Sequence, residues 1–190
     1  MGRESRQGAA LTLLPAHPKE LPTIRVAPEA KKQRLLAGLA GARHEVLAAA
    51  RDLPRAEQDT VFLGSWSVHD IVAHLIGWDH ANREAVEAIR SGRLPAFYAR
   101  YDRDWRAFNA ELVAQHTQRT LGETVAQARA SHEALLAALP ALAAADITWD
   151  YGVRSPGRRR ATIPILLKVE SRDERKHAEQ IREFCRRERR

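Results

Sequence analysis

The chain has 190 residues, of which 44% are hydrophobic and 29% charged, a composition typical of one soluble globular domain. No run approaches the roughly 18 consecutive apolar residues that a membrane span requires. The single cysteine, Cys185, excludes an intrachain disulfide and any site that needs several thiolates. The apolar patch at 10–14 is shorter than the roughly 7–15 residues of a signal-peptide core, so we expect a cytoplasmic protein.

The net charge of +7 is concentrated at the two ends of the chain. Residues 1–34 hold seven Lys and Arg against three Asp and Glu, and residues 154–190 hold thirteen against six, whereas residues 35–153 hold eleven against fifteen. The basic runs at 157–160 and 186–190 could contact phosphate, but a DNA-reading surface usually combines positive charge with aromatic or amide side chains on a folded face. Solvated charge runs are common, so nucleic acid is not the expected partner.

Residues 1–28 are predicted to form an extended or mobile arm, and residues 29–190 a helical body. The arm contains four prolines and no sustained hydrophobic period. From Ala30 to Leu53 the apolar residues recur at alternating steps of four and three, which predicts an amphipathic helix that ends before Pro54. Its seam consists of Leu35, Leu39, Ala42, Val46, Ala49 and Leu53.

Three further long helices are expected downstream. The second begins after Ser67, an N-cap residue with Asp70 three positions on, and ends at Gly92. The aromatic-rich stretch 94–116 is interpreted as a loop followed by a helix from about Asp102. A helix at roughly 121–139, a loop with a short strand or turn at 140–162, and a last helix from Ile163 complete the chain. Without any βαβ alternation, this order predicts an all-α four-helix bundle with a helical segment inserted between helices 2 and 3.

The last helix is not apolar where a bundle core should be. Its seam consists of Leu166, Glu170, Asp173, His177, Ile181 and Phe184, with three ionisable residues in succession. In the second helix, His74 stands beside the apolar stripe, four residues after Asp70. Asp173 and His177 are also four apart, so each pair shares one helix face. Two facing helices that each offer a carboxylate and a histidine are one way to build a metal site inside a bundle.

Two explanations of this polar seam remain open. Buried His and Asp often satisfy each other by hydrogen bonding, and for His74 alone this explanation is as good as ligation. Burying Glu170, Asp173 and His177 without partners would cost about 1–3 kcal/mol per group, and more when charged. A divalent cation would compensate, and so would Arg172 or Arg175 if they folded back.

Other motifs are weaker. Glu174 and His177 form a Glu-x-x-His step like that of di-iron bundles, but the step occurs once where such a site needs two. Glycine-rich nucleotide loops and the Gly-x-Ser-x-Gly nucleophile motif are absent from the sequence. Five aromatic residues are candidates to fill the core, and the two tyrosines among them could instead line a pocket mouth: Trp66, Trp78, Tyr98, Tyr101 and Trp105.

Two runs, WSVHDIVAHLIGWDHANREAV (66–86) and DERKHAEQIREF (173–184), resemble the DinB-like superfamily of four-helix bundles. The resemblance covers about residues 30–188 and is strongest to the branch that contains the colibactin self-resistance proteins, ClbS/DfsB. In the superfamily the first metal ligand is the histidine of an Ala-His-Leu-x-x-Trp pattern, which His74 matches. The last helix usually adds two histidines four apart, of which His177 matches the second, whereas Asp173 stands in place of the first.

The resemblance implies one divalent ion (zinc, nickel or iron) held by His74, Asp173 and His177, with positions open for water or a low-molecular-weight thiol. In the colibactin-resistance branch the histidine triad is not dependable. A metal-free pocket, in which Asp173 and Glu170 act directly as acid and base, is therefore the other interpretation.

Three functional hypotheses follow. The first is a hydrolase or thiol transferase that acts on a small electrophilic metabolite in detoxification or self-resistance. In this enzyme Glu170, or Asp70 from the facing helix, would be the general base, and the five aromatic residues Trp66, Trp78, Tyr98, Tyr101 and Trp105 would bind the substrate. The second is a non-catalytic small-molecule binder or interaction protein, and the third a nucleic-acid-associated protein that uses its basic ends. A homodimer is among the expected assemblies.

Overall fold

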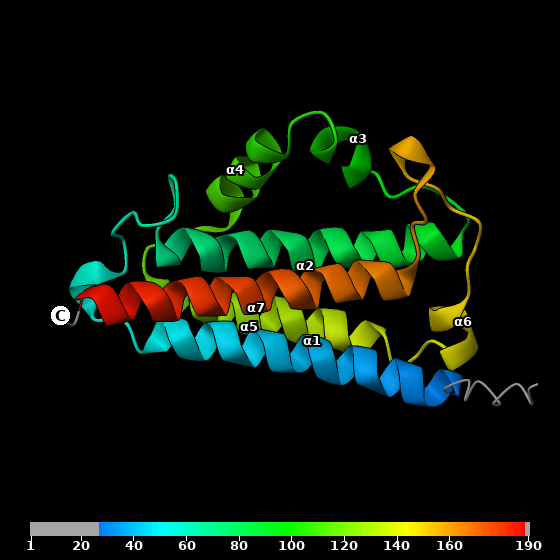
Figure 1. Cartoon of the computed structure of the whole chain (residues 1–190), viewed down its shortest axis with the longest axis horizontal. Coiled ribbons are helices and arrows are strands. Elements are labelled where there is room, and N and C mark those ends of the chain that lie inside the picture. Colours follow the sequence, from blue (N-terminus) through cyan, green and yellow to red (C-terminus); the bar gives the residue numbers. More distant parts are fainter. Residues whose placement is uncertain (1–26, 189–190) are drawn as a thin grey trace, which may run out of the picture.

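The computed structural model describes residues 27–188, which form helices and loops without a β-strand (Figure 1). Four long helices make up a bundle: α1 (Pro28–Arg51), α2 (Val68–Arg90), α5 (Leu121–Ala138) and α7 (Ile163–Glu188). Two helices inserted between α2 and α5, α3 (Phe97–Tyr101) and α4 (Trp105–His116), lie over α2 (Figure 1). The predicted all-α bundle with its insertion is therefore confirmed. Among residues 27–188, no helix combines the length and apolar character needed to cross a membrane.

The ends of the long helices follow local signals in the sequence. Helix α1 begins at Pro28, so nearly all of the arm predicted for residues 1–28 lies outside the described residues. At the start of α2, the Ser67 hydroxyl accepts a hydrogen bond from the Asp70 N–H, and the Asp70 carboxylate accepts one from the Ser67 N–H. This reciprocal capping box satisfies two backbone donors that a helix start leaves unpaired. Thr120 and Glu123 form the same box at the start of α5.

The connections contain more helix than the sequence predicted. Helix α3 lies in a stretch interpreted as loop, and α4 begins at Trp105 after the N-cap Asp104 rather than at Asp102. The 140–162 connection, expected to be a loop with a short strand or turn, contains α6 (Ala144–Thr148) and a 3-10 turn at Pro156–Arg158. Another 3-10 turn lies at Arg55–Glu57. Within the stretch 148–152, where a short strand or turn was expected, Thr148 ends α6 and no strand forms, while Gly152 has a φ of 78° and donates its N–H to Asp150.

The apolar core consists of two clusters along the bundle. One includes Val46, Ile71 and Ile181, and the other includes Leu39, Leu135 and Leu167. All six seam residues predicted for α1 are buried. Each large aliphatic side chain buried in this way contributes about 1.5–3 kcal/mol. These two clusters hold the helices together, and Arg43, Asp79 and Glu174 lie on the stretches of helix between them.

The inserted helix α4 approaches α2 closely at Gly77. A side-chain carbon placed on Gly77 would lie 2.7 Å from the Cβ atom of Leu112, so the contact requires glycine. One residue further along α2, the Trp78 indole Nε1 donates a hydrogen bond of 3.2 Å to the Asn109 side chain of α4. These contacts fix the insertion over one face of the bundle.

Candidate functional site

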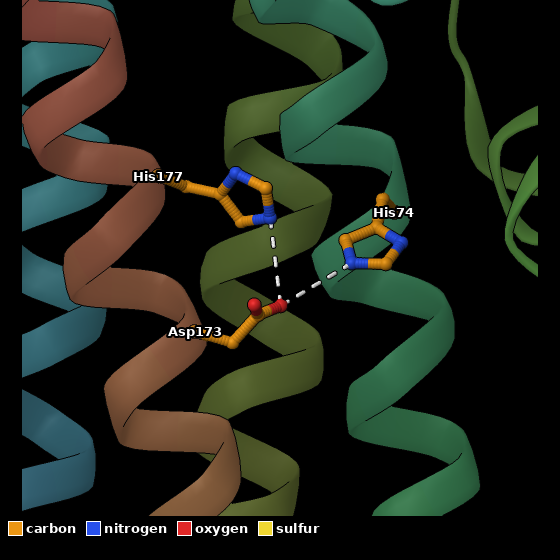
Figure 2. Close-up of side chains that lie close together, drawn as sticks. All are labelled: His74, Asp173 and His177. Atoms are coloured by element: carbon orange, nitrogen blue, oxygen red, sulfur yellow. Dashed lines mark ion pairs between the residues drawn. The ribbon is translucent and has the colours of Figure 1, made fainter. Parts of the chain in front are cut away.

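The three predicted metal ligands come together between two helices of the bundle. His74 extends from α2, and Asp173 and His177 extend from α7 (Figure 2). The Nε2 atoms of His74 and His177 lie 3.7 Å and 3.4 Å from the same carboxylate oxygen of Asp173. One ligand atom from each residue lies within 4.8 Å of the other two, a spacing that a single metal ion can bridge.

Burial and neighbouring groups shift the pKa values of His74 and Asp173. Burial lowers the pKa of His74, and the neighbouring His177 lowers it further against the opposing effect of Asp173. Burial alone would raise the pKa of the Asp173 carboxyl, but the two histidine rings hold it below its ordinary value. The His177 Nδ1 atom lies 2.9 Å from the Gln180 side-chain oxygen, a contact that holds the ring with Nε2 toward Asp173.

Two imidazole nitrogens and an ionised carboxylate thus face one another. A proton on one ring nitrogen or a metal cation between the groups balances such an arrangement, and burial disfavours a proton on His74. Two nitrogens and one carboxylate oxygen suit zinc, nickel or iron. Gln180 orients His177 through its second ring nitrogen, as partners of metal-binding histidines commonly do. The residues present therefore fit a divalent metal ion.

The surroundings of the cluster leave one side open. The side chain of Asp173 is 46% exposed, whereas that of His74 is 3% exposed. The Trp66 ring lies 4.8 Å from the His74 ring and covers it. Among the described residues, the His74 Nδ1 atom has no hydrogen-bond partner. An ion bound here would be held from the interior by His74, and other molecules could reach it on the exposed side beside Asp173.

The cluster forms part of the wall of a cavity of about 1220 Å³. The cavity lies against α2 and α7, the α3–α4 insertion and the connection that precedes α7. Trp78 is central to the aromatic part of this wall, with ring centroids of Phe97, Tyr101 and Phe108 at 5.3–5.6 Å. All five aromatic residues predicted to bind substrate line this cavity: Trp66, Trp78, Tyr98, Tyr101 and Trp105.

The two predicted general bases have different positions. Glu170 lines the cavity, is 7% exposed, and accepts a hydrogen bond of 2.8 Å from the Asn82 amide. Burial, together with the charges of Glu174 and Asp79, raises the pKa of the Glu170 carboxyl well above its ordinary value. The structure does not bring Asp70 to the cavity, because its carboxylate is bound to the N–H and hydroxyl of Ser67 in the helix cap.

A second polar cluster lies in the core and was not predicted as a unit. The Arg43 guanidinium donates to both carboxylate oxygens of Asp79, at 2.8 Å and 3.0 Å, and to Glu174 at 2.7 Å. Arg43, Asp79 and Glu174 are at most 3% exposed. In the sequence, Asp79 of α2 and Glu174 of α7 stand at core-facing positions without a local partner. This pattern could have indicated that a cation is buried beside them.

This core cluster also corrects two sequence-based interpretations. Arg172 and Arg175 do not compensate the buried acids: Arg172 lines the cavity, and Arg175 donates to the Gly38 carbonyl. The Glu-x-x-His step is divided, because Glu174 binds Arg43 whereas His177 faces the cavity. Asp79, His132 and Glu174 also have a spacing that suits a metal ion. Arg43 already supplies a positive charge there, and it pairs with both carboxylates.

The fold and the site together define a four-helix-bundle protein with a candidate metal centre on the wall of a large cavity. Residues 38–181 match the family model of the DinB superfamily, and the chain belongs to that superfamily. Metal binding is frequent among its members. No curated protein and no solved structure matches the chain.

Proposed function

We propose that this protein is a metal-dependent DinB-like enzyme of the hydrolase or thiol-transferase type, which acts in the cytoplasm on a small electrophilic metabolite. The observation that carries the proposal is the convergence of His74, Asp173 and His177 on one point of the cavity wall. The resemblance to the colibactin self-resistance branch supports a role in detoxification or self-resistance.

The proposed ligands have distinct tasks. A divalent ion bound by His74, Asp173 and His177 would act as a Lewis acid and lower the pKa of a water or thiol beside it. Gln180 holds the His177 ring so that Nε2 faces Asp173. Asp173 lies on the exposed side of the cluster, where a reactant enters.

Glu170 is the proposed proton-transfer group. Its raised pKa keeps the carboxyl protonated at pH values where an exposed glutamate is ionised, so it donates a proton to the leaving group and takes one back from the attacking water or thiol. Asn82 fixes the carboxyl by donating to one of its oxygens. The aromatic wall around Trp78 excludes water and binds the apolar part of the substrate.

Elemental analysis of the purified protein tests the proposal directly. We expect near-stoichiometric zinc, nickel or iron in the native chain and its loss in His74→Ala. His80→Ala is the matched control, because His80 is an exposed histidine of the same helix that does not line this cavity. Absence of metal from the native protein, with thermal melts unmoved by chelator or added cations, would rule out the metalloenzyme.

Activity screens then separate catalysis from sequestration. Hydrolysis and thiol-transfer assays on small electrophiles are expected to show turnover by the metal-loaded protein and strong loss of turnover in Asp173→Asn. A protein that only sequesters its ligand would be stabilised by that ligand, would show no turnover, and would tolerate Asp173→Asn.

A further inference from the structure

The mouth of the cavity is rich in positive charge. Five cationic side chains line it, from three separate parts of the chain: Arg106 of α4, Arg159 and Arg160 of the connection before α7, and Arg172 and Lys176 of α7. Three acids line it as well, Asp102, Glu170 and Asp173. The charge that the wall presents to a ligand therefore depends on which of these cations and acids are paired with each other.

Neither Asp173 nor Glu170 forms an ion pair with these lysine and arginine side chains within residues 27–188. Asp173 lies between the two histidine rings, and the buried Glu170 carboxyl is held by Asn82. Three of the cations are uncompensated: Arg159, Arg172 and Lys176 make no ion pair or side-chain hydrogen bond within residues 27–188 and are exposed. The cavity thus presents free cations toward any molecule that enters it.

Apolar side chains lie beside these cations. On α7, residues Ile165, Val169, Arg172 and Lys176 all line the cavity and follow at steps of four, three and four, so they form one stripe along the helix. Ile165 and Val169 are 42% and 49% exposed, and Trp105 across the cavity is 46% exposed. Half of the six large hydrophobic side chains exposed in the described part of the chain are thus in this wall.

We propose that the cavity binds an amphiphilic anion, a small molecule with an apolar or aromatic body and an acidic group. The body packs on Ile165, Val169 and Trp105, and the carboxylate, sulfonate or phosphate lies against Arg172 and Lys176. An exposed apolar surface next to unpaired cations favours a ligand that carries both properties. The inference rests on the proposed function, in that the same cavity is the substrate site, and it defines the class of that substrate.

Two fluorescent probes with the same ring system test the charge requirement. 8-Anilino-1-naphthalenesulfonate is an aromatic anion, and N-phenyl-1-naphthylamine is its uncharged counterpart without the sulfonate. Both are titrated into the native protein, into the double variant Arg172→Gln with Lys176→Gln, and into the control Lys168→Gln with Arg186→Gln. The control removes two exposed cations from the same helix that do not line the cavity.

The double variant is expected to raise the Kd of the sulfonate about tenfold and to change that of the neutral probe less than about twofold. The control variant should leave both values unchanged. High salt should weaken the sulfonate and not the neutral probe, because exposed charges are screened. Trp105→Ala should weaken both probes, which locates them in the cavity.

Several results would overturn the inference: equal effects of the double variant and its control, equal effects on both probes, no binding of the sulfonate, or no effect of Trp105→Ala. Metal content measured on the same samples keeps this inference separate from the proposed function, because Arg172 and Lys176 are not ligands. Loss of charge selectivity with metal retained overturns the anion site alone. Charge-selective binding by a protein that holds no metal overturns the metalloenzyme alone.

Discussion

The two polar clusters of this bundle involve neighbouring residues of α7 and differ in what balances their charge. In the core, Glu174 and Asp79 share the guanidinium of Arg43, and all three side chains are almost completely buried. At the cavity, Asp173 faces two histidines, is half exposed, and has no lysine or arginine as an ion-pair partner in the described residues. The core cluster thus contains a lysine- or arginine-type cation of its own, whereas among residues 27–188 the only basic side chains that pair with Asp173 at the cavity are the two histidines.

Because of this difference, the adjacent residues Asp173 and Glu174 of α7 have different proposed roles, one in ligand binding and one in stability. A buried carboxylate that is already paired with a cation has little capacity to bind anything else, and it serves to fix the register of α1, α2 and α7. A carboxylate beside two imidazole nitrogens, open on one side, is available to a ligand. The presence of a built-in cation therefore distinguishes the two sites better than their similar content of acids and histidines.

The largest effect is expected from breaking the core cluster. Arg43→Met leaves Asp79 and Glu174 buried without their cation, which should lower the free energy of unfolding by about 3–5 kcal/mol. Urea denaturation measures this change. Arg175→Met, which removes an exposed arginine paired with Glu45, should cost less than about 1 kcal/mol.

A second variant keeps this prediction testable if Arg43→Met does not fold. Adding Glu174→Gln removes one of the uncompensated acids and should recover part of the lost stability. An Arg43→Met protein as stable as the native chain would contradict the ionic character of the core cluster.

Metal removal should affect the cavity cluster alone. At a metal concentration 100 times the Kd, the bound ion stabilises the fold by about 2.7 kcal/mol, so a chelator should lower the Tm by about 5–10 °C. The same chelator should not change the Tm of His74→Ala, which lacks a ligand. Equal shifts in both proteins would show that the chelator acts elsewhere.

The partner of His177 is expected to tune metal affinity without touching the metal. Gln180→Leu removes the acceptor at Nδ1, which should weaken metal binding about 10–100-fold. Competition with a chromophoric chelator measures this affinity. Gln180→Glu restores an acceptor and should recover most of the affinity, and unchanged affinity in Gln180→Leu would remove Gln180 from the site.

Glu170 is expected to give the protein a distinctive pH dependence of stability. Glu170 has a raised pKa in the folded protein, so its contribution to stability is complete below its ordinary pKa of 4.5 and is lost as the pH rises through the folded value. The slope reaches about 1.4 kcal/mol per pH unit in that interval. Glu170→Gln should remove this contribution, as measured by denaturation from pH 5 to pH 8. The exposed Glu179→Gln should keep the native slope, and a native slope in Glu170→Gln would contradict the prediction.

Most of the bundle could be predicted because long amphipathic helices repeat one signal many times. The seam of α1 and the Ser67 cap of α2 each follow from local chemistry, and the structure has them as expected. Helices α3 and α6 could not be predicted in the same way. Each has five residues and no side-chain cap, so neither a period nor a cap signal marks them.

The candidate site was partly predictable for the same reason. His74, Asp173 and His177 were found because residues four apart share a helix face. Asp70 has the same spacing to His74, but the helix start needs its carboxylate as a cap. Arg43 was missed because its partners are 36 and 131 residues away, and no local pattern connects residues at such separations.

Because the α3–α4 insertion packs on α2 at Gly77, the residues that would bind the metal and many of those that would contact the substrate belong to different parts of the chain. The candidate metal ligands belong to α2 and α7, whereas much of the aromatic wall, including Tyr98, Tyr101 and Trp105, belongs to the inserted segment. Exchange of that segment would therefore alter which molecules fit while preserving the groups that act on them. Ligand specificity can therefore evolve through changes in the α3–α4 insertion while the four-helix bundle and its candidate metal ligands stay the same.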